Sequence, residues 1–212
     1  MGTMRWRARD PFSCYSHLLG AILSVVALVT LLVWYAETPR HVVGFAVYGA
    51  SLVVLYSAST IYHWLDLSPR GEEILWRFDH VAIFGLIAGT YTPVCLVNLC
   101  GAWGWSVLGV VWGIALGGAA LKLCYRRLPP WLSTAMYLAM GWIAVVAFAP
   151  LVRGVPLARL MWLIGGGLAY TAGSVIYVLE QTPLSHEIFH VFVLAGSALH
   201  FVFMARYVAP AT

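Results

Sequence analysis

Residues 12–35 read FSCYSHLLGAILSVVALVTLLVWY and contain no Asp, Glu, Lys or Arg. A helix needs about 20 predominantly apolar residues to cross the hydrocarbon core of a bilayer, so this stretch predicts a membrane-spanning helix. The rest of the chain is similar, because 62% of the 212 residues are apolar and only 9% are charged. Soluble domains contain about 25% charged residues. The composition therefore excludes an ordinary soluble protein and a nucleic-acid-binding protein.

Six further apolar runs are separated by charges, prolines or glycines. We expect one all-α integral membrane domain over residues 1–212, a bundle of seven transmembrane helices. The predicted spans are 12–35, 42–63, 79–99, 103–123, 131–151, 157–179 and 185–207. In two spans, small residues recur one turn apart, which lets helix backbones approach closely. We expect these faces to pack within the bundle, with a homo-oligomer contact as the alternative: Gly109, Gly113 and Gly117, and Gly165, Ala169 and Gly173.

The distribution of cations predicts the orientation, because cytoplasmic segments of membrane proteins are enriched in Lys and Arg. With the N-terminus inside, the inner segments hold Arg5, Arg7, Arg9, Arg70, Arg77, Lys122, Arg126 and Arg127. The outer segments then hold Arg40, Arg153, Arg159 and Arg206. We therefore expect a cytoplasmic N-terminus and an outside C-terminus. The small size and short loops favour a multi-pass protein of a bacterial inner (plasma) membrane.

Ionisable side chains inside apolar spans are informative, because each costs several kcal/mol unless it is paired or hydrated. His17 lies near the start of the first span, and His63 ends the second. Asp79 opens the third, and His186 and His190 open the seventh. In the predicted topology all five lie near the cytoplasmic boundary. Four spans therefore contribute polar groups to one layer.

The spacing within this layer is typical of a metal site. His186 and His190 are four residues apart, so both imidazoles face one way on a helix. With His63 they make three histidines, and three protein ligands plus a water are typical of catalytic zinc. Asp79 is then placed to act as a general base, and Ser59, one turn before His63, to donate a hydrogen bond. The alternative is that these histidines are hydrated among the lipid headgroups and have no function.

Residues 186–190 also read HEIFH, which matches the HExxH pattern of zinc metalloproteases. In that pattern the glutamate, here Glu187, is the general base. The pattern fixes only three positions, so chance matches are common. An intramembrane metalloprotease therefore stays open as an alternative on these residues.

Four motifs, in this order, resemble the haemolysin III family, which belongs with the progestin and adipoQ receptors and more distantly with the alkaline ceramidases. They are SASTIYH at 57–63, FDHVAIF at 78–84, AGTYTP at 88–93 and HEIFH at 186–190. The resemblance implies a seven-helix bundle with zinc held near the cytoplasmic side by His63, His186 and His190. It also implies that Ser59 and Asp79 match the family's site residues, and that Glu187 is a neighbour of the site rather than its base.

The start of the first span departs from the family pattern. The family favours a Glu and an Asn before Thr-His, whereas this chain has Asp10, Ser13 and Ser16 before His17. Asp10, Ser13 and His17 share one helical face, and we expect them to support the site rather than to take part in its chemistry.

The residues and the resemblance together favour a zinc-dependent membrane hydrolase that acts on a lipid amide or ester and is linked to membrane-lipid homeostasis. Zn²⁺ is the expected cofactor, membrane lipids are the expected partners, and Asp79 and Ser59 are the expected catalytic residues. One alternative is a non-enzymatic receptor-like or sensor-like bundle with a structural zinc, for which Asp79 would be the fourth ligand. A cytolysin, suggested by the family name, is another, and the metalloprotease is less favoured.

Overall fold

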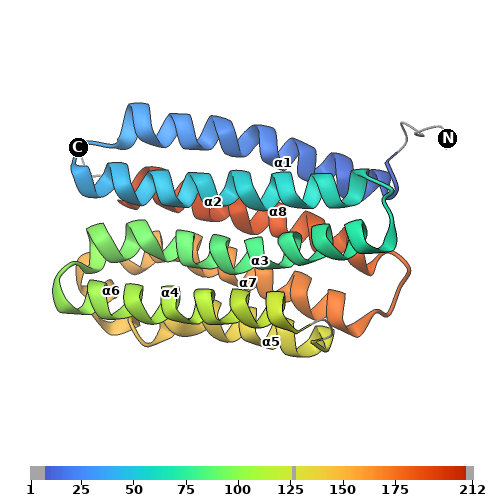
Figure 1. The fold of residues 1–212 in the computed structure, drawn as a ribbon. Coiled ribbons are helices and arrows are strands. Elements are labelled where there is room, and N and C mark those ends of the chain that lie inside the picture. The colour runs from blue at the N-terminus through green and yellow to red at the C-terminus, as the bar shows by residue number, and fades with distance from the viewer. Residues whose placement is uncertain (1–7, 126–127, 209–212) are drawn as a thin grey trace.

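The structure is a computed structural model that describes residues 8–125 and 128–208, and these residues form helices and no β-strand. Figure 1 shows the long helices lying side by side in a bundle. They are α1 Pro11–Thr30, α2 Pro39–Trp64, α3 Pro69–Pro93, α4 Gly101–Cys124, α5 Pro130–Gly141, α6 Phe148–Gly154, α7 Leu157–Leu179 and α8 Ser185–Phe203. Short π-helical turns extend α1 to Tyr35, α3 to Leu99 and α8 to Val208.

Within the described residues, six helical segments are long and apolar enough to cross a membrane: Pro11–Tyr35, Pro39–Trp64, Pro69–Leu99, Gly101–Cys124, Leu157–Leu179 and Ser185–Val208. The outer face of α1 illustrates this, because Tyr15, Ile22 and Val26 are each more than half exposed. Such faces are stable only against lipid or a partner of similar chemistry. The chain is a multi-pass integral membrane protein, as its composition predicts.

The fifth predicted span, 131–151, is not one helix. It consists of α5, a 3₁₀ turn over Trp142–Val145, and the short α6. Pro150 explains the break, because proline has no N–H and its ring clashes with the carbonyl four residues earlier in a continuous helix. By restarting at Phe148, α6 places Pro150 in its first turn, where N–H groups have no partner within the helix.

Three helices begin with a polar residue followed by a proline. The side chains of Asp10, Thr38 and Ser68 each accept a hydrogen bond from the backbone N–H three residues later, and the next residue is proline. Both features favour a helix start. The Ser68–Pro69 pair starts α3 ten residues before the predicted position 79. Asp79, expected to open the third span, therefore lies about three turns inside α3.

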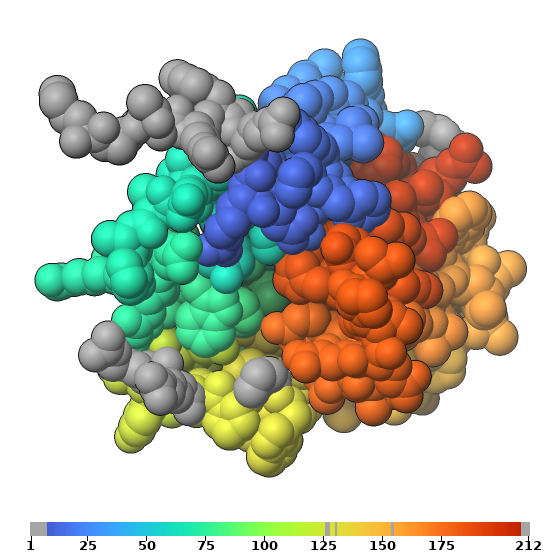
Figure 2. Space-filling view, turned by 90° about the vertical axis from the view of Figure 1, so that its right-hand side faces the viewer, coloured from blue at the N-terminus to red at the C-terminus, as the bar shows by residue number. Residues whose placement is uncertain are grey.

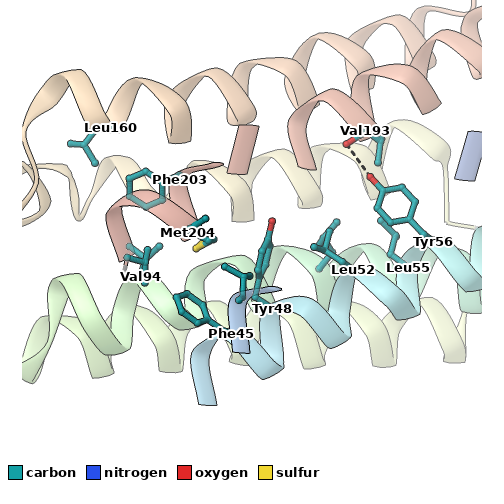
Figure 3. Packing of buried hydrophobic residues seen from close by; sticks show 14 of the residues in the cluster. Phe45, Tyr48, Leu52, Leu55, Tyr56, Val94, Leu160, Val193, Phe203 and Met204 are labelled. Atoms are coloured by element: carbon teal, nitrogen blue, oxygen red, sulfur yellow. Dashed lines mark hydrogen bonds between the residues drawn. The ribbon is translucent and has the colours of Figure 1, made fainter. Parts of the chain in front are cut away.

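The apolar core lies around α2 and α8. Figure 3 shows Phe45, Tyr48 and Leu52 of α2 in the same cluster as Val193 and Phe203 of α8. This packing fixes α2 against α8, and so it fixes the end of one helix relative to the start of the other.

A hydrogen-bonded cluster reinforces this contact and adds α7. The Tyr56 hydroxyl lies 2.7 Å from the Ser197 hydroxyl and 3.2 Å from the Val193 carbonyl oxygen (Figure 3 shows the Tyr56–Val193 bond). The Tyr170 hydroxyl of α7 lies 2.7 Å from the same Ser197 oxygen. Buried hydroxyls need such partners, because water is excluded. Three helices are therefore joined at one serine.

With α5 and α6 counted as one broken span, consecutive spans run in opposite directions, so His63 at the end of α2 and His186 at the start of α8 lie at one end of the bundle, the histidine end. Figure 2 looks onto this end, where the starts of α1 (blue) and α8 (orange) lie beside the α2–α3 connection (teal). Half of the cations assigned to the inner side, Arg5, Arg7, Arg126 and Arg127, lie outside the described residues. The orientation in the membrane stays a prediction.

The two small-residue faces differ. A Cβ at Gly173 of α7 would lie 2.6 Å from the Phe192 Cβ of α8, so this face packs within the bundle as predicted. A Cβ at Gly109, Gly113 or Gly117 of α4 would meet no atom within 4 Å. The prediction that this second face packs internally is wrong, because the contacts of α4 are made by its other side, where Val107, Val111 and Ala115 are buried.

A close contact between α2 and the backbone of α3 suggests a test of the fold. A Cβ at Gly44 would lie 2.7 Å from the Pro93 Cα, which is backbone that cannot move aside easily. We expect Gly44→Ala to lower the free energy of unfolding by about 1–3 kcal/mol through overpacking. Gly113→Ala is the matched control, and it should leave stability unchanged or raise it by up to about 1 kcal/mol. Thermal unfolding in detergent, followed by tryptophan fluorescence, measures both. Equal stability of the two variants would contradict this packing.

Candidate metal centre

The ends of two helices bring three histidines together. His63 lies in the last turn of α2, and His186 and His190 lie on consecutive turns at the start of α8. Helix α8 begins at Ser185, whose hydroxyl accepts a hydrogen bond from the Thr182 N–H at 3.2 Å. His63 and His190 are buried. The histidines therefore stand on ordered helices and not on a loop.

The ring nitrogens have the spacing of ligands to one ion. His186 Nε2 lies 3.3 Å from His63 Nε2 and 3.1 Å from His190 Nε2. One ring nitrogen from each of the three lies within 4.8 Å of the others. Three nitrogens at about 2.0–2.1 Å from a tetrahedral zinc ion lie about 3.3 Å apart. The three imidazoles fit this geometry.

The number of N–H groups on the three imidazoles also favours a cation between them. A neutral imidazole has one N–H and one lone pair, so His186 Nε2 can satisfy at most one of its two neighbours by donating. A cation between the three nitrogens would accept all three lone pairs at once. Imidazole ligands suit zinc, whereas magnesium and calcium prefer oxygen ligands.

Asp10 orients His63 from the start of α1. Its Oδ2 lies 3.3 Å from His63 Nδ1, and its backbone N–H donates to the His63 carbonyl at 3.2 Å. This is an ion-pair contact and not a hydrogen bond; the negative charge beside Nδ1 favours the ring proton there and leaves the Nε2 lone pair free for a metal. The sequence-based expectation that Asp10 supports the site therefore has a definite geometry. His17, on the next turns of α1, stacks on His190 with ring centroids 3.8 Å apart.

Ser59 and Asp79 form a pair one turn deeper. Ser59 is buried on α2, four residues before His63, and its side chain lies next to the Asp79 carboxyl of α3. Asp79 does not belong to the group of ligand atoms that includes the three histidines within the described residues. The structure thus places Ser59 and Asp79 together beside the histidines, and not on them.

A cavity of about 500 Å³ opens from this site into the bundle. The polar residues that line it at the histidine end include Ser59, Asp79, His80, Lys122, His186 and His190. Toward the other end its walls are mainly apolar, with Val94, Leu99, Leu151, Leu160 and Leu163 among them. Small-molecule sites have volumes of roughly 300–1,000 Å³ and mostly apolar walls. The cavity suits a ligand with a polar head and an apolar chain.

The cavity also extends to the break in the fifth span. Val145 and Phe148 are among the residues that line it, and their exposed fractions are 60% and 40%. Apolar side chains at the break therefore face both the cavity and the outside of the bundle.

Glu187 has a different position. It lies between His186 and His190 in the sequence, but it is not among the described residues that line the cavity. Successive residues on a helix point about 100° apart, an offset that the glutamate of any HExxH helix shares, so this offset does not decide its role. Only the position of Glu187 outside the cavity wall disfavours a metalloprotease base.

Sequence reasoning missed Lys122, which was counted as a loop charge although it lies within the predicted span 103–123. An ionisable residue inside a span is itself a signal of function. Trp76, which precedes the predicted span 79–99, lines the same cavity, as does Tyr137, whose hydroxyl donates to the His80 carbonyl at 3.0 Å.

A family model described as Haemolysin-III related matches residues 5–201. The chain belongs to the haemolysin III family. It is 40% identical over 197 residues to Hemolysin-3 of Bacillus cereus, covering 92% of this chain and 90% of that protein. It is 39% identical over 188 residues to the Hemolysin-3 homolog of Bacillus subtilis (strain 168), covering 88% of each.

A more distant relative extends the relationship. The chain is 27% identical over 169 residues to heptahelical transmembrane protein ADIPOR2 of Oryza sativa subsp. japonica, covering 64% of this chain and 68% of that protein. This haemolysin III protein is therefore also related to the adiponectin receptor superfamily, as its motifs indicate.

The Asp10–His63 contact makes a prediction. Asp10→Asn removes the charge that orients His63, and loss of such a partner typically weakens metal affinity about 10–100-fold. We expect this weakening in zinc titrations against a competing chelator. Asp66→Asn is the matched control, because Asp66 is exposed in the α2–α3 connection, and its affinity should equal that of the wild type. Unchanged affinity in Asp10→Asn would contradict an orienting role.

Proposed function

We propose that this haemolysin III protein is a zinc-dependent membrane hydrolase that cleaves an amide or ester bond in a lipid. The observation that carries the proposal is the convergence of three imidazole nitrogens, 3.1 and 3.3 Å apart, at the polar end of an apolar cavity.

The ligand set favours a catalytic over a structural metal. Structural zinc sites are usually closed by four protein ligands, whereas catalytic sites keep one position open. In the described residues the group of candidate ligands contains three histidines and no carboxylate. Asp79, the candidate fourth ligand of a structural site, instead lies beside Ser59. This arrangement supports the hydrolase over the receptor-like alternative.

His63, His186 and His190 would hold the ion, which when bound would activate water and polarise a carbonyl group. The apolar part of the cavity binds the acyl chain and excludes bulk water from the acyl carbonyl. Asp79 accepts the proton of the attacking water and returns it to the leaving amine or alcohol as the C–N or C–O bond breaks. Ser59 lies beside the Asp79 carboxyl and positions it.

The roles of two acidic residues test the proposal. General acid–base catalysis contributes about 10²–10⁴-fold, so Asp79→Asn should lose that much hydrolysis of fluorogenic lipid amides or esters by the purified, zinc-loaded protein. It should keep its zinc, because Asp79 is not a ligand. Glu187→Gln is the matched control, and we expect it to retain both zinc and activity.

Two results would contradict these assignments. Hydrolysis that survives in Asp79→Asn with zinc retained would remove Asp79 from the chemistry. An inactive Glu187→Gln would favour the metalloprotease instead. A wild-type protein that binds zinc but cleaves none of a broad panel of lipid amides and esters would overturn the hydrolase in favour of a non-catalytic bundle.

A further inference from the structure

Lys122 is the only lysine in the chain, and its side chain is buried in the last turn of α4, with an exposed fraction of 2%. It lines the cavity that also holds Asp79, His186 and His190. A buried ammonium group is costly unless it is paired with an anion or fully hydrogen-bonded. The surroundings of Lys122 therefore indicate what the cavity binds.

The described neighbours do not neutralise Lys122. Its Nζ donates one hydrogen bond to the Ser133 hydroxyl of α5 at 2.9 Å and lies 4.2 Å from the centre of the Trp76 ring. The ion pairs within the described residues join other groups, so no carboxylate among them lies within 4 Å of this ammonium. An ammonium group can donate three hydrogen bonds. The site thus offers positive charge and further donor capacity to the cavity.

The position of Trp76 relates Lys122 to the metal centre. Trp76 and Asp79 are three residues apart on α3, which is about 4.5 Å along the helix axis and on nearly the same face. The His80 ring lies 4.4 Å from the Trp76 ring and also lines the cavity. Lys122 and Asp79 therefore line the same polar part of the cavity, with the Lys122 ammonium against the Trp76 ring.

We propose that Lys122, with Ser133 and Trp76, forms a binding site for the anionic group of an acidic lipid, a phosphate or a carboxylate. The apolar walls of the same cavity favour a lipid over a soluble anion, because they suit an acyl chain attached to that group. If the proposed hydrolase function holds, on which this last step rests, the substrate is an acyl ester or amide that also carries an acidic group.

Lipid retention tests the site without relying on catalysis. The full-length protein is purified in neutral detergent, mixed with phosphatidic acid or phosphatidylcholine, and retained lipid is counted by native mass spectrometry. A charge-assisted hydrogen bond contributes about 1.5–3 kcal/mol, so Lys122→Met should retain about 10–100-fold less phosphatidic acid. Lys122→Arg should retain phosphatidic acid. The matched control is Arg70→Gln, an exposed cation at the same end of the bundle, and it should behave like the wild type.

A second measurement needs no variant, in case Lys122→Met does not fold. Because the chain has one lysine, the rate at which a membrane-permeant amine reagent modifies it can be read from the Lys122 peptide. Phosphatidic acid should slow this modification, and phosphatidylcholine or inorganic phosphate at the same concentration should not.

The outcomes separate the alternatives. Equal phosphatidic acid retention by folded Lys122→Met and wild type, or an unchanged modification rate, overturns the proposal. Protection by inorganic phosphate as strong as by the lipid also overturns it, in favour of a soluble anion. Lys122-dependent retention in a protein that hydrolyses nothing supports this site and removes the proposed function. Hydrolysis without Lys122-dependent retention supports the proposed function and overturns this site.

Discussion

Polar groups inside an apolar bundle must find partners within the protein, because the hydrocarbon region supplies no water to satisfy them. The three imidazoles at the ends of α2 and α8 are the strongest case of this constraint. Their nitrogens lie 3.1 and 3.3 Å apart, a separation that brings lone pairs into conflict unless a cation lies between them. Two contacts keep the rings in this arrangement. The packing of α2 on α8 sets where the rings meet, and Asp10, at the start of α1, lies against Nδ1 of His63.

The other polar groups of the cavity lie on α3 or in contact with its side chains. Trp76 lies against Lys122, His80 lies next to Trp76, and Asp79 reaches Ser59 on α2. Basic, acidic and imidazole groups thus line one polar end, and the walls beyond them are mainly apolar, which suits a hydrocarbon chain. This division makes a lipid with an acidic head the simplest ligand for the cavity as a whole. The same division explains why the chain tolerates so many polar side chains within a membrane domain.

Much of this could be predicted from the sequence. Helical spacing alone placed His186 and His190 on one face, and hydropathy placed His63 at the same end, so the three-histidine group needed no structure to be proposed. The errors come from features that hydropathy does not weigh. Because residues 70–77 include several charges, hydropathy does not show that α3 begins at Pro69, although Ser68–Pro69 is a typical helix start. Pro150 was passed over inside a uniformly apolar run. Lys122 was assigned to a loop, and only the packing of α4 against α5 shows that its ammonium faces the cavity. The pairing of Asp10 with His63 joins residues 53 positions apart and depends on how α1 meets α2.

The central claim is that His63, His186 and His190 bind one zinc ion and leave a position open. X-ray absorption spectroscopy at the zinc edge, on protein purified in detergent without chelators, measures this most directly. We expect one zinc per chain with three imidazole nitrogens at about 2.0–2.1 Å and one further light-atom ligand that is not imidazole, and the same spectrum in Asp79→Asn. A folded protein without zinc would contradict the claim. A fourth ligand that disappears in Asp79→Asn would contradict it too, because it would make the site closed and structural.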